Sequence, residues 1–106
     1  MSLIEERKAL ALSAIKESFD TKAGEDGVTL FVDHDLEEVE ASYWKQHLGN
    51  EKPERSAVLT LLVFKSSWGR DDAEYFDFTL PEETTNYVVS VHFDREGTIY
   101  RIEMES

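Results

Sequence analysis

The stretch FVDHDLEEVE, residues 31–40, combines one histidine with five carboxylates, the side chains that bind metal ions or transfer protons. If this stretch begins as a strand, its side chains alternate, so His34 points to one face while Asp33 and Asp35 point to the other. The three groups then do not converge on one ion. Asp35 followed by Glu38 also has the spacing of a helix capping box. The sequence therefore favours a structural role for this stretch.

The capping box predicts that a strand over residues 28–34 leads into a helix over residues 36–48, which ends at Gly49. Apolar side chains recur along one side of this predicted helix, and carboxylates gather at its beginning. We interpret these carboxylates as an exposed acidic surface that can attract a basic partner. They are Glu37, Glu38 and Glu40.

The spacing of the histidines argues against a metal site. His34, His47 and His92 fall in separate elements, and no two of them have the H-x-x-x-H spacing of a zinc-binding helix. The five glycines form neither a dinucleotide-binding nor a phosphate-binding loop, and no G-x-S-x-G motif occurs. The sequence therefore predicts no metal, no cofactor and no catalytic residue, and it favours a protein that is not an enzyme.

The last third of the chain shows the clearest strand pattern. Apolar and polar residues alternate in three segments, which are Tyr75–Leu80, Tyr87–Phe93 and Thr98–Met104. The sequences PEETTN and DREG separate them, and both are typical of turns. These features predict a three-stranded antiparallel meander with one buried face.

The turns also predict how the strands pair. Both hairpins bury the same apolar face, and a shift by one residue would bury the polar side chains instead. The predicted pairs are Phe78 with Val89 and Phe76 with Val91 in the first hairpin, and Val91 with Tyr100, Val89 with Ile102 and Tyr87 with Met104 in the second.

The same register assigns polar side chains to the opposite face of the sheet. Three rows are predicted to cross the strands: Tyr75, His92, Ile99; Asp77, Ser90, Arg101; and Thr79, Val88, Glu103. In one interpretation Asp77 and Arg101 form a surface ion pair that adds little stability. In the other, this face is a contact platform, and its binding residues are Tyr75, Asp77, His92 and Arg101.

The remaining elements complete the predicted fold. Apolar residues at helical intervals predict an amphipathic helix over residues 3–21, with Ser2 and Glu5 as its capping box. Residues 53–66 fit a helix or a strand, and we favour a short helix from Pro53 that leads into an extended segment. We expect a single α+β domain, residues 1–106, in which the N-terminal helix and a second helix pack on the antiparallel sheet.

Composition narrows the classes of partner. The 106 residues include 23 acidic and 11 basic ones, for a net charge of −12, and residues 23–42 contain seven acids and no base. The electric field of this negative charge repels nucleic acid and anionic lipid, and it attracts a basic protein. The absence of cysteine and of any long apolar segment predicts a cytoplasmic protein.

The chain resembles a family of small, acidic bacterial proteins known only as a domain of unknown function. The resemblance rests on FDFTLP (76–81), TNYVVSVHFDREGTI (85–99) and the terminal MES (104–106), with YWKQHLG (43–49) and SSWG (66–69) in addition. It implies the α+β fold and assigns no catalytic residue. In charge and size the chain is also similar to immunity proteins, which neutralise basic toxins.

The leading prediction is a non-enzymatic binding module that engages a basic protein through the acidic helix surface and the outer sheet face. Two alternatives remain open. One is a small hydrolase or isomerase with a site formed by Tyr75, Asp77 and His92. The other is a structural homodimer that forms through an exposed edge strand.

Overall fold

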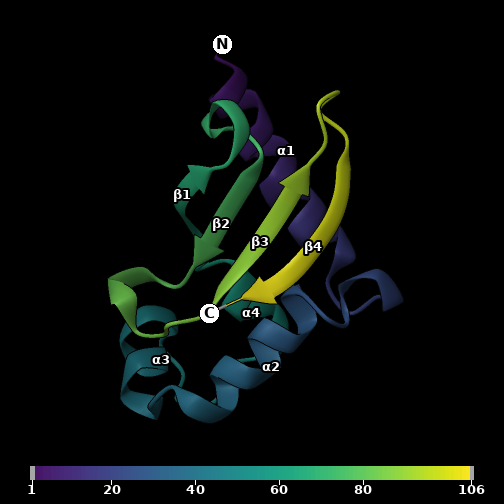
Figure 1. Ribbon diagram of the computed structural model, residues 1–106. Coiled ribbons are helices and arrows are strands. Elements are labelled where there is room, and N and C mark those ends of the chain that lie inside the picture. The colour runs from purple at the N-terminus through teal and green to yellow at the C-terminus, as the bar shows by residue number, and fades with distance from the viewer. Residues whose placement is uncertain (1, 106) are drawn as a thin grey trace.

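The computed structural model describes residues 2–105 and has the predicted α+β architecture (Figure 1). Helices form the first half of the chain and strands the second. The helices are α1 (Leu3–Ser18), α2 (Val28–Glu38), α3 (Ala41–Leu48) and α4 (Arg55–Leu59), and the strands are β1 (Val63–Trp68), β2 (Tyr75–Thr79), β3 (Val88–Phe93) and β4 (Ile99–Glu105). Within the described range, no helix is both long enough and apolar enough to cross a membrane.

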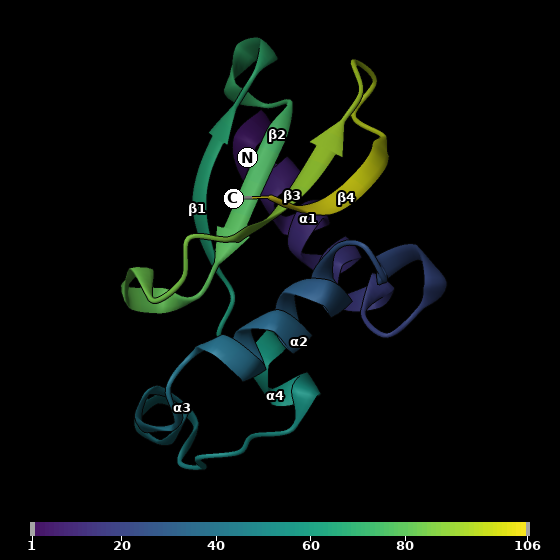
Figure 2. The same cartoon turned by 60° about the horizontal axis from the view of Figure 1, so that its bottom comes forward.

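The strands form one antiparallel sheet in the order β1-β2-β3-β4. Helix α1 lies behind the sheet in Figure 1, while α2, α3 and α4 gather at one end of it, as Figure 2 shows. One hydrophobic core joins the helices to the covered sheet face, and its largest fully buried side chains include Trp44, Phe31, Phe76, Phe78 and Phe93. The opposite sheet face, which α1 does not cover, is called the outer face below.

Helix α1 confirms the predicted N-terminal helix and its cap. The Ser2 hydroxyl accepts a hydrogen bond from the Glu5 backbone N–H at 3.2 Å, which satisfies one of the free donors at the helix start. Ala11 and Ile15, one turn apart, are fully buried. The helix ends at Ser18, three residues earlier than predicted.

The predicted strand over residues 28–34 is wrong, because these residues begin helix α2. The buried residues of α2 are Val28, Phe31, Val32 and Asp35, which have the i, i+3, i+4, i+7 spacing of one helix face. The β-branched and aromatic composition suggested a strand, but burial against α1, α4 and the sheet selects the helix. Asp35 therefore lies inside a helix and does not cap one.

The single helix predicted over residues 36–48 is also wrong, since two helices share this range. Helix α2 ends at Glu38, Val39 is extended, and α3 begins at Ala41 without a side-chain cap. The predicted end is confirmed: Gly49 has a φ of +72°, the left-handed conformation that glycine adopts most easily.

The ambiguous segment over residues 53–66 contains both elements, as predicted. Helix α4 is a short helix at Arg55–Leu59, and β1 follows it from Val63. Strand β1 then pairs with β2 at the edge of the sheet.

The predicted β2–β3 register is confirmed, with Phe78 opposite Val89 and Phe76 opposite Val91. The β3–β4 register is wrong by two residues. Val91 lies opposite Ile102, Val89 lies opposite Met104, and Tyr87 lies outside β3.

A bulge accounts for one residue of this shift, and the pairing of Phe93 with Ile99 at the turn accounts for the other. His92 pairs with Arg101 and Phe93 pairs with Ile99, so Tyr100 is an extra residue on β4. Ile99 therefore packs against the core, although it was predicted to lie on the outer face, and Tyr100 is exposed.

Candidate functional site on the outer sheet face

The outer face carries a dense group of polar side chains over the three strands of the meander. Tyr75, His92 and Arg101 form one row across the strands. The next row contains Asp77 and Ser90, and it continues to Glu103 on β4. The predicted row that joined Asp77 and Ser90 to Arg101 is therefore wrong, because the shifted register replaces the arginine with a carboxylate.

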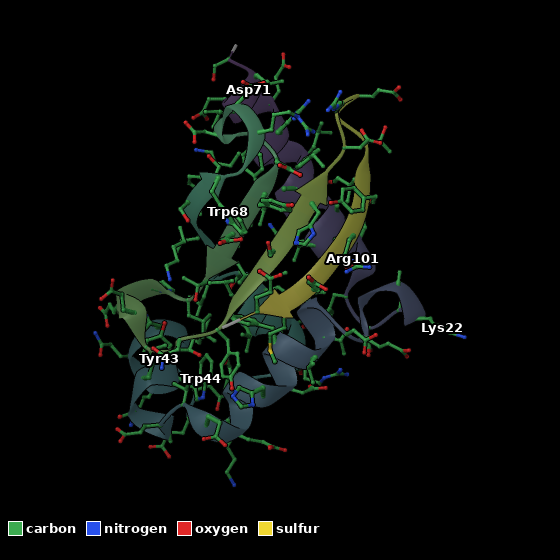
Figure 3. All side chains as sticks on the ribbon, viewed as in Figure 1. Lys22, Tyr43, Trp44, Trp68, Asp71 and Arg101 are labelled. Atoms are coloured by element: carbon green, nitrogen blue, oxygen red, sulfur yellow. The ribbon has the colours of Figure 1, made fainter. Side chains whose placement is uncertain are left out.

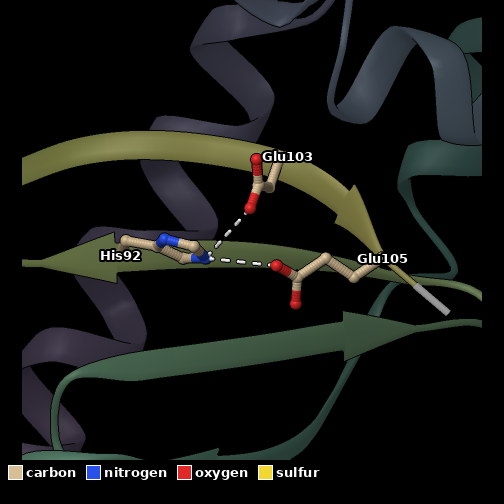
Figure 4. Close-up of side chains that lie close together, drawn as sticks. All are labelled: His92, Glu103 and Glu105. Carbon is tan, nitrogen blue, oxygen red and sulfur yellow. Dashed lines mark ion pairs between the residues drawn. The ribbon is translucent and has the colours of Figure 1, made fainter.

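His92, Glu103 and Glu105 form a compact cluster, which we call the histidine–carboxylate cluster (Figure 4). His92 Nε2 lies 3.8 Å from Glu103 Oε1 and 3.8 Å from Glu105 Oε1. The His92 side chain is only 9% exposed, while those of Glu103 and Glu105 are 32% and 35% exposed. The imidazole thus comes from β3, and the two carboxylates come from the adjacent edge strand β4.

Burial and charge shift the pKa values in this cluster. Burial of the Glu105 carboxyl, together with its hydrogen bond and charge repulsion with Glu103, raises the pKa of Glu105 to about 7. Burial lowers the pKa of His92, and this effect exceeds the opposing attraction of Glu103. The cluster therefore holds a carboxyl that is partly protonated and an imidazole that is neutral near pH 7.

Several buried polar atoms on this face have no hydrogen-bond partner among residues 2–105. They are His92 Nε2, Ser90 Oγ and Asp77 Oδ1. Such atoms are uncommon in folded proteins, because a buried polar atom without a partner loses its hydration. All three lie on the adjacent strands β2 and β3 of the outer face.

Aromatic rings cross the same face from edge to edge. The ring centroids of Trp68 and Tyr75 lie 4.2 Å apart, those of Tyr75 and His92 lie 4.7 Å apart, and those of His92 and Tyr100 lie 5.9 Å apart. We call these four residues the aromatic row. Trp68 on β1 and Tyr100 on β4 are 46% and 56% exposed, so both ends of the row are open to solvent.

Asp77 fixes the exposed tryptophan of this row. The Trp68 indole N–H donates a hydrogen bond to Asp77 Oδ2 at 3.0 Å. Because the N–H is held at the ring edge, the indole has a defined orientation beside Tyr75. The predicted binding residues Tyr75, Asp77 and His92 thus lie together on one face.

Arg101 lies on the same face but has another partner than predicted. Its Nη1 lies 3.6 Å from Glu103 Oε2, and its side chain is 61% exposed. Figure 3 shows Trp68 and Arg101 toward opposite edges of the sheet. The arginine therefore limits the negative charge at the β4 edge.

The predicted acidic helix surface lies elsewhere on the molecule. Glu37, Glu38 and Glu40 are exposed at the junction of α2 and α3, the helices that gather at one end of the sheet (Figure 2). Two of them, Glu38 and Glu40, line a shallow groove together with Tyr43 and Gln46. The structure therefore separates the predicted binding residues into two surfaces.

Sequence reasoning missed three residues of the outer face, Trp68, Tyr100 and Glu105, and it placed Glu103 on this face but beside Val88 instead of Ser90. Glu103 and Glu105 alternate with apolar residues along β4, and this alternation was a usable signal once the strand was predicted. The bulge at Tyr100 could not be predicted, because the sequence of β4 looks the same as that of a regular strand.

A second unusual group, Asp35, lies in the core. It is fully buried, and neither carboxylate oxygen has a hydrogen bond of ordinary geometry within the described range. Burial raises the pKa of Asp35 to about 6, although nearby His34 and Thr85 oppose this shift.

No family model, curated protein or solved structure matches this chain. The resemblance to the small acidic bacterial family therefore stays a prediction.

Proposed function

We propose that this protein is a non-enzymatic binding module whose outer face receives a lysine or arginine side chain of a basic protein partner. The observation that carries the proposal is the aromatic row, which lies beside the carboxylates of Asp77, Glu103 and Glu105. Aromatic faces and carboxylates together form the surroundings that a cationic side chain prefers.

The exposed rings supply the first part of this recognition. A cation over the face of tryptophan or tyrosine gains about 0.5–1 kcal/mol at an exposed site and about 2 kcal/mol when it is desolvated. Trp68 and Tyr100 are about half exposed, and the bond to Asp77 holds the Trp68 ring in place. A guanidinium group that stacks on Trp68 therefore does not have to reorder the ring.

Net charge supplies the second part. A chain with a charge of −12 attracts a basic partner over a distance of about one Debye length, which is roughly 8 Å at physiological ionic strength. This attraction speeds association and makes it salt-sensitive. A basic toxin of the type that immunity proteins bind would supply both the cationic side chain and the positive net charge.

The direct test is a titration with a short peptide that contains two arginines and one lysine, with a matched peptide in which glutamine replaces all three. We expect the indole N–H signal of Trp68 in a proton–nitrogen NMR spectrum to move with the basic peptide only. The Trp44 signal should stay, because that side chain is buried. Affinity should fall as salt is raised.

Two variants locate the binding surface. Trp68→Ala should weaken peptide binding by about fivefold or more, which corresponds to one cation–π contact. The triple variant E37K/E38K/E40K reverses charge on the helix surface and changes the net charge from −12 to −6, so it should slow association but weaken binding less than Trp68→Ala does. If the triple variant loses binding and Trp68→Ala does not, the outer face is not the binding surface.

An enzymatic role near Asp77 and His92 is favoured by one observation. His92 is buried, and its lowered pKa keeps the imidazole neutral, as a general base requires. A histidine titration by NMR tests this alternative, because a solvent-like pKa for His92 would remove it. The alternative of a homodimer, formed through the edge strand β1 or β4, is tested by sedimentation.

A further inference from the structure

We infer that His92, Glu103 and Glu105 form a binding site for a divalent transition-metal ion of the zinc class. The inference rests on the convergence of one imidazole nitrogen and two carboxylate oxygens, which all lie within 4.8 Å of one another. It does not depend on the proposed function. Neither the spacing of the histidines nor the acidic stretch around His34 predicted a metal site at His92.

The imidazole provides the strongest support. His92 Nε2 is buried, points toward both carboxylates and has no hydrogen-bond partner among the described residues (Figure 4). Its 3.8 Å separations from the glutamate oxygens are too long for hydrogen bonds. A metal ion between these atoms would give the nitrogen the partner that it lacks.

The distances suit such an ion after small side-chain movements. Zinc binds histidine nitrogen at about 2.0–2.1 Å and carboxylate oxygen at about 2.0–2.2 Å, so tetrahedral ligand atoms lie roughly 3.3–3.5 Å apart. The present 3.8 Å separations are a few tenths of an ångström longer. Both glutamates are partly exposed on the edge strand β4, and their side chains have room to rotate.

Arg101 positions one of the ligands. Its Nη1 lies near Glu103 Oε2, whereas Glu103 Oε1 faces His92. One oxygen is thus paired with the arginine, and the other is left for the metal. This arrangement favours a single metal–oxygen bond from Glu103.

The ligand types select the class of metal. Imidazole suits zinc, iron, nickel and copper, whereas magnesium and calcium prefer sites made only of oxygen atoms. Three protein ligands leave a fourth position for water or for a group of a binding partner. Two ionised glutamates would also balance the charge of the ion.

The test uses the untagged wild-type protein with zinc chloride, followed by calorimetry and by NMR of the histidine ring nitrogens. We expect one zinc ion per chain and a shift of the His92 Nε2 signal, with His34 and His47 unchanged. A tenfold excess of magnesium should not displace the zinc. The NMR measurement on the wild type requires no variant to fold.

Isosteric variants test the carboxylates. Glu103→Gln and Glu105→Gln should each weaken zinc binding by about tenfold or more, because each removes a charged ligand. Glu96→Gln removes the same charge from the turn before β4 and should change the affinity less than about twofold. The inference is overturned if no zinc binds, if the His34 or His47 signal moves instead of the His92 signal, if magnesium competes equally, or if Glu96→Gln matches the cluster variants.

Discussion

The carboxyl of Asp35 should make the stability of this protein fall as the pH rises through about 6. Asp35 is fully buried in α2, and burial raises its pKa from 3.8 to about 6. The folded protein therefore holds this proton more tightly than the unfolded chain does. The stabilisation is fully present below pH 3.8 and is lost as the pH passes about 6.

The shift of about two pKa units fixes the magnitude. One unit corresponds to about 1.4 kcal/mol, so the ionised carboxylate costs about 3 kcal/mol of unfolding free energy above pH 7. Asp35→Asn removes the charge and retains the shape of the side chain. The unfolding free energy of the variant, relative to the wild type, should therefore rise by about 3 kcal/mol between pH 3.5 and pH 7.5.

Urea unfolding, followed by tryptophan fluorescence at several pH values, measures this difference. Trp44 is buried and should report loss of the core. Glu37→Gln, an exposed position on the same helix, is the control and should give a difference that changes by less than about 0.5 kcal/mol. If the difference for Asp35→Asn is equally flat, the carboxyl is hydrated or paired, and the reasoning from burial is refuted.

Two further predictions concern the helix end and the outer face. Gly49→Ala should lower the unfolding free energy by about 1 kcal/mol, since the φ of +72° strains any L residue while an added Cβ meets nothing within 4 Å; a larger loss in urea unfolding would show that the site is also crowded. Zinc should weaken binding of the basic peptide, because an ion at the histidine–carboxylate cluster would offset the charge of Glu103 and Glu105. Calorimetry with and without zinc measures this change in affinity. An unchanged affinity would mean that peptide binding does not depend on these carboxylates.

Local signals determined several parts of the fold. Strict alternation in the last third predicted the meander, and the positions of Phe76 and Phe78 opposite β3 followed from the burial of one face. Ser2 with Glu5 and the terminal glycine Gly49 correctly marked a helix start and a helix end. These features depend on residues close together in the chain, so the sequence alone contains the information.

The errors arose where a local pattern supports two structures. The segment from Val28 to Val32 has strand composition, yet its apolar residues also fit one face of a helix. Packing of that face against α1, α4 and the sheet decided the outcome. Asp35 was predicted to cap a helix start, but in the structure it is a buried residue inside α2.

The sequence by itself determined the fold class, the meander, the strong negative charge and the presence of Tyr75, Asp77 and His92 on one sheet face. Tertiary structure alone decided which groups face His92. The pairing of Phe93 with Ile99 and a one-residue bulge at Tyr100 together shift β4 along β3 by two residues, which brings Glu103 and Glu105 to the imidazole and turns Tyr100 outward. The physical reason is that strand register depends on pairing and packing between distant residues, which alternation along one strand does not specify.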